Sequence, residues 1–580
     1  MIYSNDVIFD LLQIFILLSL VAISVKPLGL YMFKVYSGDK TFSSFLISPI
    51  ERLVYRLINI DVKSEMNWKE YALSMLAFNI FGIILLFSIL ILQKLLPFNP
   101  EHFSGFSWHL ALNTAISFVT NTNWQAYSGE NTASYFSQMA GLSVQNFLSA
   151  ATGLAILIAL IRGLARKSIS TIGNFWVDLV RSVLYILLPI AFIGAIILMS
   201  QGVIQNFSHY KQAALTNPYL SDSGEVVDKQ ILPMGPVASQ ESIKELGTNG
   251  GGFFGANSAH PFENPTPFSN IIEIFLILLI PAALTYTFGR MINDTKQGWA
   301  IFGVMLTLLV ISIGLLMYFE YRGNDILLRS SYLSGPNMEG KEVRFGVGGS
   351  SMFVAATTGV SCGAVNTMHD SLTPLSGLIP LFLMMLGEVV FGGVGSGLYV
   401  MIAYIIIAVF ISGLMIGRSP EFLGKKIEIA EMWMSVISVL TPSILILVLV
   451  AIASIVKQAV SSILNPGAHG LSEILYAFTS AANNNGSAFA GLNANTVFYN
   501  ITTALAMFVG RFIPAVAIIY MAQSLSSKKY IPPNIGTLPT NGVAFNVWLI
   551  LVILIVGALT FFPALSLSPI VEHLIMIKGA

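Results

Sequence analysis

Long apolar stretches recur along the chain and are separated by short polar connections. A helix needs about 20 apolar residues to cross the hydrocarbon core of a bilayer, and ten stretches meet this length. They lie near residues 8–30, 70–96, 132–161, 173–200, 269–289, 299–319, 375–416, 430–456, 491–523 and 543–566. The pattern predicts an all-α polytopic membrane protein with ten transmembrane helices, organised as a single membrane-embedded domain over residues 1–580.

The composition agrees with a lipid environment. Hydrophobic residues make up 55% of the chain and charged residues 10%, whereas soluble domains carry about a quarter charged residues. The net charge is zero, which argues against nucleic acid as a partner. The connections near 201–247 and 320–347 are too short to hold a usual soluble catalytic domain, and Cys362, the one cysteine, excludes an internal disulfide framework.

The distribution of Lys and Arg predicts the orientation of the helices. One alternating set of connections holds eighteen of these residues and the other set ten, with Arg511 inside a span, which accounts for all 29. Because cytoplasmic loops carry the excess of positive charge, the first set is predicted to be cytoplasmic. Both termini are then predicted to be extracytoplasmic.

The seventh apolar stretch, residues 375–416, is too long for one straight crossing. Two crossings would place Arg418, Lys425 and Lys426 on the extracytoplasmic side, against the charge bias. A single helix that is broken around Gly387–Gly397 keeps them cytoplasmic. Irregular backbone at membrane depth must line a protein-enclosed or polar cavity, so we expect such a cavity at the break.

Four polar loops interrupt the apolar pattern, and they resemble one another. Each places a threonine (Thr120, Thr248, Thr357 or Thr479) before a short run of small polar residues, at separations of 128, 109 and 122 residues. The loops read FVTNTNWQ (118–125), LGTNGGGFFG (246–255), AATTGVSCGAVN (355–366) and FTSAANNNGSAF (478–489). The repeat predicts four units of span, re-entrant pore loop and span, plus two extra helices. The pore loops are expected near 108–125, 236–255, 348–366 and 470–487.

The chemistry of these loops favours a monovalent cation. Backbone carbonyls can replace the hydration shell of a potassium ion, and glycine permits the positive φ angles that aim successive carbonyls in one direction. The four segments lack the Asp or Glu ring expected of a filter for divalent cations. We therefore predict a potassium-binding filter made of Asn121, Thr122, Asn123, Thr248, Asn249, Gly250, Ser361, Cys362, Gly363, Asn484, Asn485 and Gly486.

The loops, above all TNGGGFFGANSAHPFENP and TSAANNNGSAFAGL, resemble those of the KdpA family over essentially the whole chain. This family is the potassium-translocating subunit of the bacterial Kdp potassium-uptake ATPase, within the wider superfamily of potassium transporters. The resemblance implies a protein of the bacterial cytoplasmic (inner) membrane that binds extracytoplasmic potassium and passes it to a P-type ATPase subunit, with small accessory subunits in the complex. Potassium is then the transported substrate, and no cofactor or catalytic centre is expected on this chain.

Two other classes of protein remain alternatives. A stand-alone potassium channel or secondary potassium transporter would use the same filter without a partner. A polytopic membrane enzyme would need a convergent set of carboxylates, a His–Ser pair or a metal site, and the sequence shows none.

Two motifs suggest phosphate chemistry but lack its context. Gly250, Gly252 and Gly255 match G-x-G-x-x-G, yet neither a strand before them nor a helix opening at the last glycine is expected. Residues Gly38–Phe42, GDKTF, resemble the phosphorylation motif D-K-T-G of P-type ATPases, but Phe42 stands in place of the glycine. We expect a cytoplasmic loop there and no ATP hydrolysis by this chain.

A charged residue inside a membrane span requires a structural or functional explanation, because inserting it into the bilayer costs about 2.5–3.5 kcal/mol. Arg511 either pairs with a carbonyl or carboxylate between helices, or repels and steers cations below the filter. Glu388, in the break beside Gly392 and Gly393, either attracts a passing potassium ion or pairs with a basic residue such as Arg511. The resemblance implies that the break is a gating loop and that Arg511 lies in the ion path.

The remaining candidate residues support the filter or contact a partner. Gln125 either braces the first filter loop from behind or caps a helix. Arg418 either anchors the cytoplasmic face or contacts the partner subunit. His260 and His369 favour bracing hydrogen bonds, since two histidines without cysteine make a poor zinc signature. No metal other than K⁺ is predicted.

Overall fold

The computed structural model describes residues 3–578 except 222–223, 325, 327–328, 330–334 and 533–536. Within these residues, ten helices are long and apolar enough to cross a membrane, which confirms the predicted helical fold. They are α1 (Tyr3–Ser37), α3 (Trp68–Leu92), α6 (Val144–Ala165), the run of α7 (Phe175–Arg181) and α8 (Leu188–Ser200), α10 (Pro267–Met291), α11 (Thr295–Arg322), α15 (Ser396–Ile416), α16 (Ile429–Ile455), α19 (Val497–Ser527) and the run of α20 (Val543–Leu565) and α21 (Val571–Lys578).

Four short helices lie between pairs of these long helices. They are α4 (Trp108–Val119), α9 (Val237–Leu246), α13 (Gly346–Gly359) and α18 (Ala468–Ala482). Helix α4 packs against α3 and α6, α9 against α8 and α10, α13 against α11 and α14 (Pro374–Met385), and α18 against α16 and α19. Each short helix ends at one of the four polar loops, so the chain forms four similar units with α1 and α20 left over. This is the arrangement that the sequence predicts.

The seventh span is broken, as its length requires. Helix α14 ends at Met385 and α15 begins at Ser396, and the ten residues between them are not helical. Positive φ angles there occur at Gly387, Glu388, Phe391, Gly392 and Gly395. The break therefore turns the backbone several times within the interior of the bundle.

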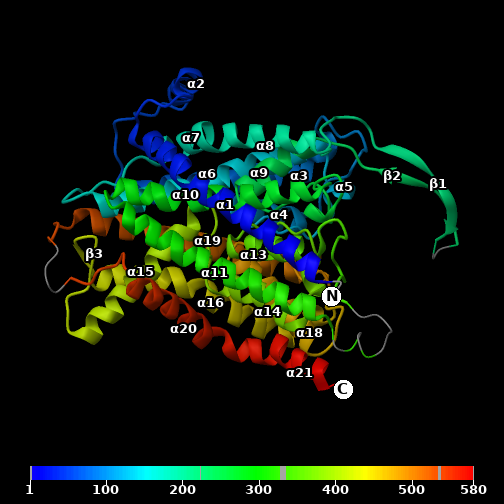
Figure 1. Cartoon of the computed structure of the whole chain (residues 1–580). Coiled ribbons are helices and arrows are strands. Elements are labelled where there is room, and N and C mark those ends of the chain that lie inside the picture. Colours follow the sequence, from blue (N-terminus) through cyan, green and yellow to red (C-terminus); the bar gives the residue numbers. More distant parts are fainter. Residues whose placement is uncertain are drawn as a thin grey trace.

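Two small elements are absent from the prediction. A β-hairpin of β1 (Lys211–Leu220) and β2 (Val226–Leu232) projects from one end of the bundle (Figure 1), within the stretch expected to be a loop. We call this the hairpin end, and the first residues of α1 and the last of α21 lie there too. At the opposite end, α2 (Ser44–Leu57) projects sideways and exposes the apolar side chains of Phe45, Leu46 and Leu53.

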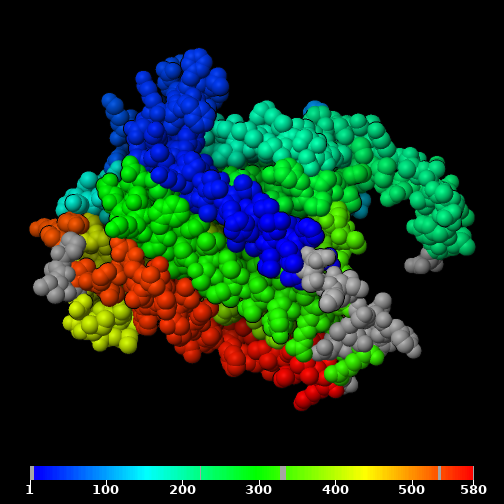
Figure 2. Space-filling view, viewed as in Figure 1, coloured from blue at the N-terminus to red at the C-terminus, as the bar shows by residue number. Residues whose placement is uncertain are grey.

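The central helices are separated from lipid by the outer ones. In the most apolar windows of α6 and α10, 83% of residues are buried inside the protein, against 17% in α1 and 28% in α20. Figure 2 shows α1 lying obliquely across the surface of the bundle, where it packs along α10. Gly29 allows this close approach, because a β-carbon there would lie 2.7 Å from the carbonyl oxygen of Ala283.

A buried ion pair joins three helices near the end of the bundle that carries α2, which we call the α2 end. The Arg162 guanidinium on α6 makes two bonds to the Asp178 carboxylate on α7, at 2.6 and 2.7 Å. Tyr71 on α3 donates its hydroxyl to the same carboxylate. The side chain of Asp178 has no solvent exposure, so loss of one partner leaves a buried charge without compensation.

We predict that Asp178→Ala lowers the free energy of unfolding by about 3–5 kcal/mol, because Arg162 stays buried without its partner. The matched control is Glu65→Ala, which removes a partly exposed bridge to Arg166 and should cost at most about 1 kcal/mol. Thermal unfolding of the purified protein in detergent measures both. Equal effects of the two substitutions would contradict the assignment.

Candidate functional site

The four polar loops meet in a ring. The first and second loops are joined by the Asn121 side-chain amide, which donates to the carbonyl oxygen of Thr248 at 2.8 Å. We call each contact between two neighbouring loops a seam. At the other three seams a glycine of one loop lies so close to the next loop that an added β-carbon would be about 2 Å from a carbonyl oxygen there. These contacts are Gly250 to Cys362 at 2.1 Å, Gly363 to Asn485 at 2.1 Å and Gly486 to Thr122 at 2.0 Å.

All four loops share one backbone pattern. The first and third residues of each predicted filter segment have positive φ, and the middle residue does not. The angles are 68° and 54° for Asn121 and Asn123, 51° and 87° for Thr248 and Gly250, 58° and 90° for Ser361 and Gly363, and 55° and 103° for Asn484 and Gly486. Left-handed conformations are costly for residues other than glycine and mark positions that the surroundings hold in place.

The middle residue of each loop is anchored to the short helix before it. Its N–H donates to a backbone carbonyl of that helix in the same way in all four units. The bonds are Thr122 to Ser117 (2.9 Å), Asn249 to Lys244 (2.9 Å), Cys362 to Thr357 (2.8 Å) and Asn485 to Ser480 (2.9 Å). The four predicted filter segments are thus equivalent in the structure. The four threonines of the sequence repeat are not, because Thr248 is itself a first filter residue, whereas Thr357 lies four residues before one.

The carbonyl oxygens of the same four middle residues have no partner. In the part of the chain that the structure describes, none of them accepts a hydrogen bond, although all four residues are completely buried. Buried carbonyls are nearly always paired in proteins, so one unpaired carbonyl from each of four loops is an unusual arrangement. It fits a ligand that needs oxygen donors.

A cavity of about 460 Å³ lies on the hairpin side of the ring. The third residue of every loop lines it, namely Asn123, Gly250, Gly363 and Gly486. Ser128 lines the same cavity, and two residues further on the carbonyl of Glu130 accepts a bond from Tyr210 next to the hairpin. The ring can therefore be reached from the hairpin end.

The broken helix lies against the other side of the ring. The backbone N–H of Val394 donates to the hydroxyl of Thr248, and Ser361 donates its hydroxyl to the Glu388 carboxylate at 2.8 Å. Gly392 and Gly393 allow the tight turn, because a β-carbon at Gly392 would lie 2.0 Å from the carbonyl of Glu388. The break thus contacts the first residue of two loops.

Glu388 and Arg511 line a small cavity of about 30 Å³ together with Asn483 and Asn484. Arg511 is 5% exposed, and one of its terminal nitrogens would lie 3.2 Å from a β-carbon at Gly153. The two charged groups form no ion pair within 4.0 Å in the described structure. The partner of Glu388 is Ser361, so the structure does not show the alternative in which Glu388 pairs with Arg511.

The remaining predicted residues lie outside the ring. Gln125 makes paired amide bonds with the N–H and carbonyl of Gly252, so it joins the first loop to the second. Arg418 is exposed and lies two residues after the end of α15. His260 stacks on Phe254, and His369 bonds the hydroxyl of Tyr476.

Residues that sequence reasoning missed lie behind the second loop. Asn257 donates its side-chain amide to the carbonyl oxygen of Gly250 at 2.7 Å, and its own oxygen accepts from the buried Lys244 ammonium. The signal is present in the sequence, because ESIKEL is the one charged stretch that directly precedes a filter loop. Periodicity alone does not show that these charges are buried.

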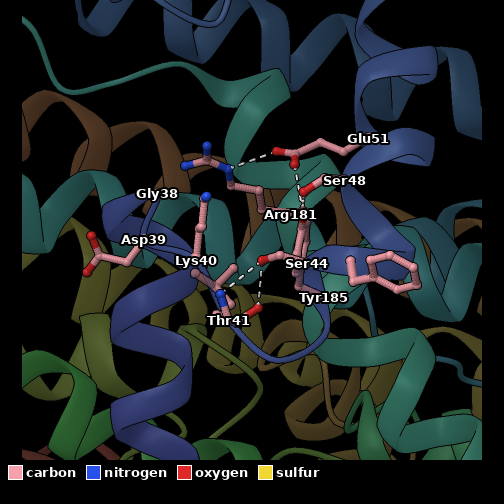
Figure 3. A pocket seen from close by; sticks show the side chains of 11 residues that line it. Gly38, Asp39, Lys40, Thr41, Ser44, Ser48, Glu51, Arg181 and Tyr185 are labelled. Carbon is pink, nitrogen blue, oxygen red and sulfur yellow. Dashed lines mark hydrogen bonds and ion pairs between the residues drawn. The ribbon is translucent and has the colours of Figure 1, made fainter.

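The GDKTF motif forms a loop between α1 and α2 at the α2 end (Figure 3). Thr41 bonds Ser44 there, and Glu51 pairs with Arg181 at 3.1 Å. The cavity beside it measures about 420 Å³. Asp39 is exposed, and among the described residues no side chain pairs with it.

A charged triad ties the fourth unit to its neighbours near the hairpin end. His469 on α18 bonds Asp370 at 3.0 Å and Glu572 at 2.8 Å. Burial lowers the pKa of His469, but the hydrogen bonds to the two carboxylates outweigh this effect and raise the pKa to about 10. The imidazole is therefore positively charged at neutral pH and joins α18 both to α21 and to Asp370, which lies just after the third loop.

Ten long helices with four short helix-and-loop units between them make up a fold that a solved potassium transporter shares. The crystal structure of the potassium transporter TrkH from Vibrio parahaemolyticus has this fold, with a TM-score of 0.50 over 87% of this chain and 97% of that chain at 13% identity. Residues 14–574 match the family described as KdpA, potassium-transporting ATPase A subunit. The chain belongs to this family.

Curated relatives cover nearly the full length of the chain. A protein of Geobacter metallireducens is 61% identical over 98% of this chain and 99% of its own length. Proteins of Geobacter sulfurreducens and of a Hydrogenobaculum strain are 59% and 56% identical, again over at least 98% of this chain and 99% of their own lengths. Each is named the potassium-binding subunit of a potassium-transporting ATPase.

The raised pKa of His469 predicts a loss of stability at high pH. The folded-state pKa of about 10 exceeds the ordinary value of 6.5, so protonation stabilises the fold below about pH 6.5 and this contribution disappears as the pH rises toward 10. The melting temperature of the wild type should fall more between pH 7 and pH 10 than that of His469→Gln. Equal falls would show that the triad does not contribute in this way.

Proposed function

We propose that the ring is a potassium-selective filter that binds extracytoplasmic K⁺ and passes it to an ATPase subunit for ATP-driven uptake. The observation that carries this proposal is the set of four buried, unpaired carbonyls on Thr122, Asn249, Cys362 and Asn485. A dehydrated K⁺ ion needs several oxygen ligands in place of its water. One carbonyl from each loop supplies them around a common axis.

The chemistry of the ring favours K⁺ over divalent cations. Calcium and magnesium are held by carboxylates, and the twelve filter residues include none. Neutral carbonyl dipoles attract a monovalent cation without holding it so tightly that it cannot leave. The 460 Å³ cavity gives the hydrated ion access to the filter from the hairpin end.

The region below the filter stops direct passage. The broken helix crosses the path under the first filter residues, and the positive charge of Arg511 repels a cation there. The Glu388 carboxylate sits within the same 30 Å³ cavity and stabilises an ion that has left the filter. Further residues of this cavity belong to α16 and α19, such as Pro442 and Pro514, so an ion would leave sideways between these helices.

The partner that receives the ion is a P-type ATPase subunit, and small accessory subunits complete the complex. The relatives named as potassium-binding subunits of a potassium-transporting ATPase support this assignment. The complex lies in the bacterial cytoplasmic membrane with the hairpin end and both termini outside. The excess of Lys and Arg in the connections at the α2 end supports this orientation, and Arg418 is available there for contact with the partner.

Gly250→Ser tests the filter. The φ of Gly250 is 87°, and a β-carbon there would lie 2.1 Å from the carbonyl oxygen of Cys362, so the side chain displaces a filter carbonyl. We expect the KM for K⁺ of the ATPase activity of the assembled complex to rise about tenfold or more, with weaker discrimination against Rb⁺. Gly303→Ser is the control, since nothing lies within 4 Å of a β-carbon at that position. An unchanged KM together with unchanged competition by Rb⁺ would show that the ring is not the potassium filter.

The alternative of a stand-alone channel or secondary transporter is decided by flux. The chain alone, reconstituted in liposomes, should give no steady ⁸⁶Rb⁺ uptake, whereas the complex with its ATPase subunit should give uptake that requires ATP. Uptake by the chain alone that needs no ATP would favour the alternative.

A further inference from the structure

Lys244, on the short helix before the second loop, is a cation enclosed by oxygen atoms. Its side chain is completely buried, and its ammonium contacts carboxylate oxygens of Glu241 at 2.7 Å, Glu263 at 3.0 Å and Glu245 at 3.3 Å. It also donates to the side-chain oxygens of Asn257 and Ser258, both at 2.9 Å. Five oxygens from two segments of the chain therefore surround one ammonium.

The positive charge of Lys244 stabilises the buried acidic side chains around it. Carboxylate oxygens of Glu241, Glu245 and Glu273 lie within 4.8 Å of one another, and all three side chains are buried. Glu263 adds a fourth carboxylate, which also accepts the N–H of Phe254. Buried carboxylates without a partner are strongly unfavourable, so the Lys244 ammonium stabilises the acids on α9 and joins this helix, through Glu263, to the segment that follows the second loop.

Lys244 occupies a position that the fourfold repeat defines. It lies four residues before the first filter residue of its loop, as Ser117, Thr357 and Ser480 do in the other three units. The backbone carbonyls of all four residues accept the N–H of the middle filter residue. Three units carry a hydroxyl side chain at this position, and the second unit carries the Lys244 ammonium. We call the five residues whose oxygens surround this ammonium the cage: Glu241, Glu245, Asn257, Ser258 and Glu263.

The cage continues directly into the filter. Asn257 accepts from Lys244 through its side-chain oxygen and donates its side-chain amide to the carbonyl oxygen of Gly250 at 2.7 Å. The same Asn257 oxygen accepts the N–H of Val365 in the third loop, and Cys362 donates its thiol to Glu245. The cage thus contacts both loops at the seam where Gly250 approaches Cys362.

We infer that Lys244 is a positioning residue of the potassium filter. Its tethered charge fixes Asn257, and Asn257 fixes the carbonyl of Gly250 and the seam between the second and third loops. Removal of the ammonium releases the seam and weakens potassium binding, although Lys244 itself never contacts the ion. This inference rests on the proposed function of the ring as a potassium filter.

The test uses the assembled complex and its K⁺-stimulated ATPase activity. Lys244→Met alone leaves buried acids without a counter-charge and can fail to fold, so the decisive variant is Lys244→Met with Glu241→Gln, which conserves the net charge. We expect its KM for K⁺ to rise about tenfold, by more than the change in kcat. Asn257→Gly, which tolerates the positive φ of Asn257, should raise the KM similarly. Lys229→Met, on the exposed face of β2, is the control.

The outcomes separate the inference from the proposed function. A double variant that assembles with a wild-type KM, while Gly250→Ser in the same assay raises the KM, overturns the role of Lys244 and leaves the filter intact. A wild-type KM in both variants overturns the filter itself. If the double variant does not assemble, Asn257→Gly decides, because a wild-type KM in that variant breaks the link from the cage to the Gly250 carbonyl.

Discussion

One constraint organises the structure: four backbone carbonyls are buried and have no hydrogen-bond partner among the residues that the structure describes. Each belongs to the middle residue of a loop whose N–H is anchored to the short helix before it, so the loop cannot turn to pair its carbonyl elsewhere. An unpaired buried polar group costs about 1–3 kcal/mol. The packing of long helices around four short ones maintains this arrangement, and in the proposed filter a bound cation offsets the cost. In the filter that we propose, selectivity follows from the geometry of a held backbone and not from side-chain charge.

The ring is fourfold in its backbone and unequal in its surroundings. The first loop uses Asn123 at the position where the other three use glycine, the second is backed by a charged cage, and the broken helix contacts the second and third loops on the side away from the large cavity. Because all four units belong to one chain, each can have different residues and different neighbouring elements around the same backbone conformation. In the proposed function this inequality gives the ion a direction of movement, since the wide cavity lies on one side of the ring and Glu388 and Arg511 lie on the other.

Most of the fold could be predicted from the sequence, because hydrophobic length and repeat spacing depend on local pattern. The ten spans and the break near Gly387–Gly397 follow from that pattern, and the four three-residue segments predicted from their small polar residues share one backbone conformation in the structure. Long-range pairing could not be predicted in the same way. The sequence leaves Arg511 open as one of two alternatives for Glu388, whereas the structure pairs Glu388 with Ser361, which is 27 residues away along the chain. The sequence likewise places Lys244 among the charged residues of the connection 201–247. Its burial appears only when α9 packs against α10 in the structure.

The position of the bound ion tests the central claim most directly. A structure of the complex in Tl⁺ or Rb⁺, which replace K⁺ and can be located by anomalous scattering, would show where the ion is held. The strongest ion peak should lie on the axis of the ring, coordinated by the carbonyl oxygens of Thr122, Asn249, Cys362 and Asn485. An empty ring with the ion bound elsewhere, for example among the carboxylates of Glu241, Glu245 and Glu273, would contradict the account.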